Sequence, residues 1–92
     1  MPYIDKEDRY KYDVLIHQIA ALVPDEHTKR PGEINYIISK LMKKIYGYDI
    51  DRPLRYWAWN ELRGAMENAI SEIYRRYVGP YEDQAITKNG DI

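Results

Sequence analysis

The side chains that most often carry chemistry are scarce in this sequence of 92 residues. It contains no cysteine, two histidines, two serines and two threonines. A metal site needs several converging ligands, and His17 has only Asp13 one helical turn before it. None of the four hydroxyls lies in the G-x-S-x-G pattern of a nucleophile elbow. We therefore expect no catalytic residue, no metal site and no cofactor, and we interpret the protein as a non-enzyme.

A basic surface is the first candidate for a binding site. Its members are one tyrosine and three lysines that share the outer face of a predicted helix: Tyr36, Lys40, Lys43 and Lys44. Lysines bind phosphates without regard to sequence, and a nearby aromatic ring such as Trp57 stacks on bases. The pI of about 6.1 is low for a nucleic-acid-binding domain. Nucleic-acid binding is therefore the alternative hypothesis. A purely structural explanation of the basic face is that the acidic C-terminal tail folds over it or pairs with it from another subunit.

A surface for a protein partner is the favoured hypothesis. Apolar and aromatic side chains remain after one core stripe has been assigned to each helix, and such surplus groups are typical of interfaces. The predicted interface residues are Tyr10, Val14, His17, Trp57, Tyr74 and Tyr81. The charge is also segregated, because residues 28–63 carry a balance of +4 between acidic ends. We expect a homo-oligomer, most simply a homodimer, or a complex with another protein.

Three amphipathic helices must position these side chains. Apolar residues recur at steps of three and four from the N-cap Asp5 to about residue 22, from residue 31 to about 46, and from about 53 to 78. Pro24, Gly47 and the Gly79-Pro80 pair are expected to end them. The longest stripe, in residues 56–78, is the element around which the others are expected to pack.

The predicted fold class is all-α: a three-helix antiparallel bundle with a short C-terminal helix or tail. We assign residues 1–79 to the bundle and residues 80–92 to a tail that packs on the bundle or on a neighbouring subunit. No apolar run is long enough to span a membrane. The absence of cysteine and of a signal-like N-terminus favours a cytoplasmic protein.

Several short motifs resemble a family of small uncharacterised helical proteins found in bacterial and phage genomes. They are Met1-Pro2-Tyr3-Ile4, Pro31-Gly32-Glu33-Ile34-Asn35-Tyr36, Glu72-Ile73-Tyr74-Arg75-Arg76, Pro80-Tyr81-Glu82-Asp83 and Asn89-Gly90-Asp91-Ile92. The resemblance covers most of the chain apart from residues 46–60. It implies a compact helical fold and a phage-related protein, and it implies no activity.

Overall fold

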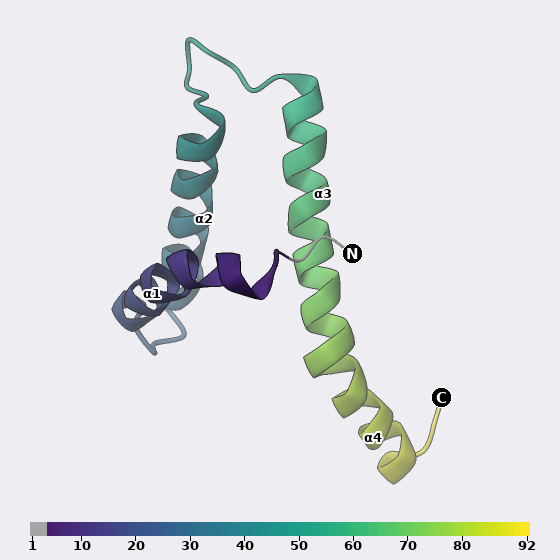
Figure 1. Cartoon of the computed structure of the whole chain (residues 1–92). Coiled ribbons are helices and arrows are strands. Elements are labelled where there is room, and N and C mark those ends of the chain that lie inside the picture. The colour runs from purple at the N-terminus through teal and green to yellow at the C-terminus, as the bar shows by residue number, and fades with distance from the viewer. Residues whose placement is uncertain (1–3) are drawn as a thin grey trace. The chain divides into compact units, whose positions relative to one another are not determined.

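The computed structural model describes residues 4–92, and every regular element in that range is helical (Figure 1). The elements in chain order are α1 (Lys6–Leu22), α2 (Arg30–Tyr46), α3 (Tyr56–Ile73), a π-helical segment η1 (Tyr74–Val78) and α4 (Gly79–Asn89). The predicted all-α class, with three main helices and a further C-terminal helix, is confirmed. No helix of the described range is long and apolar enough to cross a membrane. The chain divides into two compact units, residues 1–41 and 42–92.

The first unit contains α1, the connection to α2 and most of α2. Asp5 lies at the N-cap of α1, as predicted, and its carbonyl accepts a bond from the Asp8 N–H at 3.0 Å. Its side chain makes no capping bond, so the expected side-chain cap is absent. Glu7 and Asp8 in the first turn still stabilise the helix, because their negative charges lie near the positive end of its dipole.

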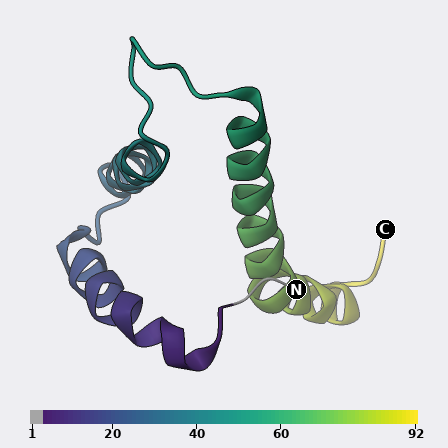
Figure 2. The same cartoon turned by 45° about the horizontal axis from the view of Figure 1, so that its top comes forward.

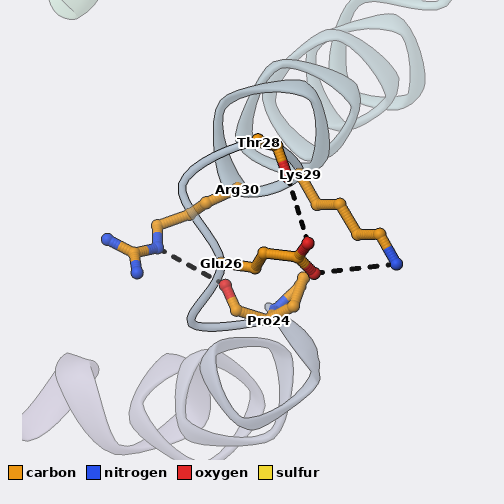
Figure 3. Close-up of polar contacts among 5 residues, drawn as sticks. All are labelled: Pro24, Glu26, Thr28, Lys29 and Arg30. Carbon is orange, nitrogen blue, oxygen red and sulfur yellow. Dashed lines mark hydrogen bonds and ion pairs between the residues drawn. The ribbon is translucent and has the colours of Figure 1, made fainter.

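The connection between α1 and α2 is held by side chains from both of its ends (Figure 3). Arg30, the first residue of α2, donates from Nε to the carbonyl of Pro24 at 3.4 Å and forms an ion pair with Asp25. Glu26 accepts from the Thr28 hydroxyl at 3.1 Å and lies 3.7 Å from the Lys29 ammonium. These local contacts stabilise the turn, although ion pairs as exposed as these contribute about 0–1 kcal/mol each.

The end of α2 follows the predicted glycine cap. Gly47 adopts φ of +71°, and its N–H donates to the carbonyl of Lys43 at 2.8 Å. An L-residue with a side chain rarely adopts this backbone conformation, which explains the glycine. The next helix starts later than predicted, at Tyr56 rather than at Pro53, because residues 49–52 form a closed turn instead.

The second unit continues in a single helical path from α3 through η1 into α4, and this path bends between α3 and α4 (Figure 2). The prediction that Gly79 and Pro80 end the helix is wrong. Pro80 has no N–H, and its ring would clash with a carbonyl four residues before it in a regular α-helix. The wider π turn accommodates it, since the Gly79 N–H donates to the carbonyl of Tyr74, five residues back.

Side-chain burial within the described residues is slight. Ala58 is the only one that is buried, with 3% of its surface exposed. The predicted core stripes of α1 and α3 are well exposed, as Leu15 (55%), Ile16 (59%) and Ile70 (65%) illustrate. Each unit therefore presents apolar helix faces that its own residues do not cover.

Two glycines provide a stability test with opposite expected signs. A Cβ added at Gly64, in the middle of α3, meets no atom within 4 Å, so Gly64→Ala should stabilise the protein by about 1 kcal/mol through helix propensity alone. Gly47→Ala should destabilise it by about 1 kcal/mol, because alanine is strained at a positive φ. Urea unfolding followed by circular dichroism at one protein concentration measures both. Equal effects of the two substitutions would contradict this assignment.

Candidate functional site

Three of the predicted interface residues lie along one side of α1 in the first unit. Tyr10 is 76% exposed and Val14 is 61% exposed, and His17 is exposed as well. Their spacing of four and three residues keeps them on a single arc of the helix. The opposite arc carries Leu15, Ile16 and Ile19 and is also exposed. Helix α1 thus offers apolar surface on two sides.

Two more predicted interface residues, Tyr74 and Tyr81, lie at the junction of η1 and α4. Tyr81 is exposed, and Tyr74 is half exposed. The Tyr74 hydroxyl donates a hydrogen bond to the carboxylate of Glu82. This hydrogen bond, together with the negative charge of Glu82, raises the pKa of Tyr74 above its ordinary value. Tyr74 is thereby tied to α4 rather than left as a free side chain.

Trp57, the sixth predicted interface residue, is the second residue of α3 and lies far from Tyr74. The two are 17 positions apart along the helical path, which corresponds to about 25 Å at 1.5 Å per residue. Trp57 is 63% exposed and instead borders a cavity of about 460 Å³ between the end of α2 and the start of α3. The structure therefore does not gather Trp57 and Tyr74 into one local surface.

The cavity is built around the connection from residue 47 to residue 55. Asp49 organises this connection, because its Oδ1 accepts from the backbone N–H groups of Asp51 and Arg52, both at 2.8 Å. Asp49 and Arg52 also exchange backbone hydrogen bonds at 3.0 and 3.1 Å. The turn places Tyr48 and Arg52 on the cavity wall with Trp57.

Sequence reasoning named Trp57 but not the cavity or Tyr48. An Asp-x-Asp-Arg-Pro segment is a recognisable turn signal, because aspartate side chains often bond the backbone N–H two or three residues on. That signal places the turn, but it does not show that the aromatic residues on either side of it border a common hollow.

The wall of the cavity is anchored by Tyr46, the last residue of α2. Its hydroxyl donates to Glu61 Oε2 at 2.7 Å, which links the end of α2 to α3. This hydrogen bond, with lesser contributions from desolvation and from the charge of Glu61, raises the pKa of Tyr46. Both tyrosine–glutamate bonds of the second unit thus depend on a protonated phenol.

The predicted basic surface lies on α2. Tyr36 is 66% exposed, and Lys40, Lys43 and Lys44 are all exposed. None of the three ammonium groups forms an ion pair with residues 4–92. Lys43 and Lys44 also lie in the last turn, where a positive charge stabilises the helix by its attraction to the negative end of the dipole.

Ionic contacts elsewhere are local pairs along helices. Glu72 lies 3.0 Å from Arg76 Nε and also pairs with Arg75, as the spacing of Glu72 and Arg76 predicts. Arg63 and Glu67 form a second pair at 2.9 Å. Within residues 4–92 no group of three histidine, aspartate or glutamate side chains gathers closely enough to hold a metal ion.

The whole chain, residues 1–92, matches the model of the DUF6899 family, which is described as a domain of unknown function. The protein is therefore a member of this family, in agreement with the expectation of an uncharacterised helical family. No curated protein and no solved structure matches the chain. The site must accordingly be interpreted from its own geometry.

The Tyr74–Glu82 bond predicts a loss of stability at alkaline pH. The pKa of Tyr74 is raised in the folded state, so its contribution to stability is complete below about pH 10, the pKa of an unfolded tyrosine. It is lost as the pH rises through the higher folded value. Glu82→Gln should lower the pKa of Tyr74 back toward 10, as followed by NMR of its Cζ carbon.

The Tyr46–Glu61 pair is the internal control for this titration. The pKa of Tyr46 is raised by a different carboxylate, that of Glu61. Glu82→Gln should therefore leave the pKa of Tyr46 unchanged, whereas Glu61→Gln should lower it. An unchanged Tyr74 titration in Glu82→Gln would show that the bond does not form in solution.

Proposed function

We propose that this protein is a non-enzymatic interaction module that associates with a second copy of itself through the exposed apolar faces of its helices. The observation that carries the proposal is the near absence of buried side chains in either unit, with Ala58 alone buried among the described residues. Exposed apolar surface of this extent is typical of proteins that bury it against a partner.

The size of the units supports association. Residues 1–41 and 42–92 are each near the lower limit at which a hydrophobic core sustains a fold without help. Small domains are commonly stabilised by disulfides, metals or oligomerisation. The chain has no cysteine, and residues 4–92 hold no metal-ligand cluster. We infer that oligomerisation stabilises these units.

A second copy is favoured as the partner by the distribution of charge. Residues 28–63 carry a balance of +4, whereas residues 1–27 and 80–92 carry −3 and −2. Two copies that place the basic region of one against an acidic end of the other satisfy both regions at once. The proposed contact residues are Tyr10, Val14, His17, Trp57, Tyr74 and Tyr81.

We further propose a cytoplasmic protein of bacterial or phage origin, as the sequence motifs and the lack of cysteine suggest.

Solution mass tests the association directly. Light scattering after gel filtration should give a multiple of 11.0 kDa for the wild-type chain. Val14→Glu should raise the dissociation constant about tenfold or more, because a charge replaces an apolar contact in the interface. Asn68→Glu adds the same charge at an exposed position of α3 outside the proposed contact residues and should leave the mass unchanged. A monomeric wild-type chain at high protein concentration would overturn the proposal.

The second candidate function is nucleic-acid binding by the basic surface on α2. It is supported by the three lysines that make no ion pair with the described residues. The competing explanation is that acidic residues of the C-terminal region, such as Glu82 and Asp83, neutralise this surface in the assembled protein.

Salt dependence distinguishes these two explanations. Fluorescence anisotropy with DNA or RNA at 50 and 200 mM salt should show binding that weakens steeply with salt. Replacing Lys40, Lys43 and Lys44 with Gln should reduce the logarithmic salt slope by about two to three. Replacing Lys6, Lys11 and Lys88 removes equal charge elsewhere and should change the slope little. Absence of binding at 50 mM salt would exclude the basic surface as a nucleic-acid site.

A further inference from the structure

The cavity between α2 and α3 combines aromatic rings with unpaired positive charge, and it lies wholly within the second unit. Its volume of about 460 Å³ is within the range of small-molecule sites in proteins. Neither the apolar arcs of α1 nor the lysines of α2 account for this combination.

Three aromatic side chains border the cavity: Tyr46, Tyr48 and Trp57. The Tyr46 hydroxyl is occupied by Glu61, which holds that ring in place. Trp57 is 63% exposed, so much of its side chain is accessible to a ligand. An accessible indole beside a hollow favours a flat aromatic ring, since stacking on tryptophan tolerates many heterocycles.

Two arginines, Arg52 and Arg55, supply positive charge on the same wall. Neither guanidinium forms an ion pair or hydrogen bond with the residues that the structure describes. This sets them apart from Arg30, Arg63, Arg75 and Arg76, each of which pairs with a carboxylate. An unpaired guanidinium beside a cavity is suited to bidentate binding of a phosphate.

The start of α3 adds to this preference for an anion. Arg55 is the N-cap and provides no side-chain capping bond, and the first turn contains no acidic residue. The first N–H groups of α3 and the positive end of its dipole therefore lie beside Arg55 and Trp57, which border the cavity. Asp51 also borders the cavity and opposes an anion, but with two arginines the lining keeps a net positive charge.

We propose that this cavity binds a nucleoside monophosphate unit, with the base stacked on Trp57 and the phosphate held by Arg52 and Arg55. The unit has two natural sources, a free nucleotide or one residue of a single-stranded nucleic acid. Trp57 is then a ligand-binding residue of the cavity, and the proposed self-association surface consists of the other five residues.

The test uses the full chain with Trp59→Phe, so that Trp57 is the only tryptophan. Trp59 does not border the cavity. Adenosine monophosphate should quench the Trp57 fluorescence with a saturable curve. Adenosine, which lacks the phosphate, should bind at least tenfold more weakly, and inorganic phosphate should compete with the nucleotide.

Arginine variants locate the phosphate. Arg52→Gln and Arg55→Gln should each raise the dissociation constant for adenosine monophosphate about tenfold. Arg63→Gln removes the same charge from α3 outside the cavity and should leave it unchanged. Circular dichroism confirms that each variant remains helical. No saturable quenching at millimolar nucleotide, equal binding of adenosine, or an equal effect of Arg63→Gln would each overturn the proposal.

A tetranucleotide identifies the source of the ligand. Binding at least tenfold tighter than the mononucleotide would indicate a strand that continues past the cavity, whereas equal binding would indicate a free nucleotide. Solution mass measured on the same samples separates this result from self-association, because a monomer with saturable quenching supports the cavity alone.

Discussion

Apolar helix faces that lack an internal cover are the constraint on which this structure depends. Each main helix carries a stripe of large hydrophobic side chains, and the described part of the chain buries only Ala58. Hydrophobic burial is the main favourable contribution to folding, and a chain without cysteine has no disulfide to replace it. Association through these faces would supply the missing burial, which is why the proposed function and the stability of the fold are the same physical question.

The junction of α3 and α4 shows how a local backbone adjustment creates a longer-range contact. Pro80 requires a wider turn, and the π-helical segment supplies it, since the Gly79 N–H donates to the Tyr74 carbonyl five residues back. Tyr74 and Glu82 are eight positions apart, or about 12 Å along a straight α-helix. The bend between α3 and α4 (Figure 2) helps the phenol to reach that carboxylate. A residue pair that would break a regular helix thereby becomes part of a continuous one.

Sequence patterns predicted local features well where a single residue decides the outcome. The glycine cap at Gly47 is confirmed. Glu72 pairs with Arg76, as a spacing of four residues on a helix favours. Both features depend on contacts within about one helical turn. The start of α3 was predicted three residues early, since Pro53 opens no helix when an aspartate turn precedes it. The predicted end at Gly79 is wrong because a π turn lets the helical path continue through Pro80. The cavity was not predicted, because it depends on how the last residue of α2, the connection and the first turn of α3 come together.

The sequence by itself determined the all-α class, the extent of the helices to within a few residues and the separation of basic and acidic regions, because periodicity, caps and charge are properties of neighbouring residues. Only the tertiary structure decided that Tyr46 bonds Glu61 and that Trp57 borders a cavity with Arg52 and Arg55. These relations depend on the directions that the chain takes between and within helices. A turn and a bend set those directions, and helical periodicity carries no information about either.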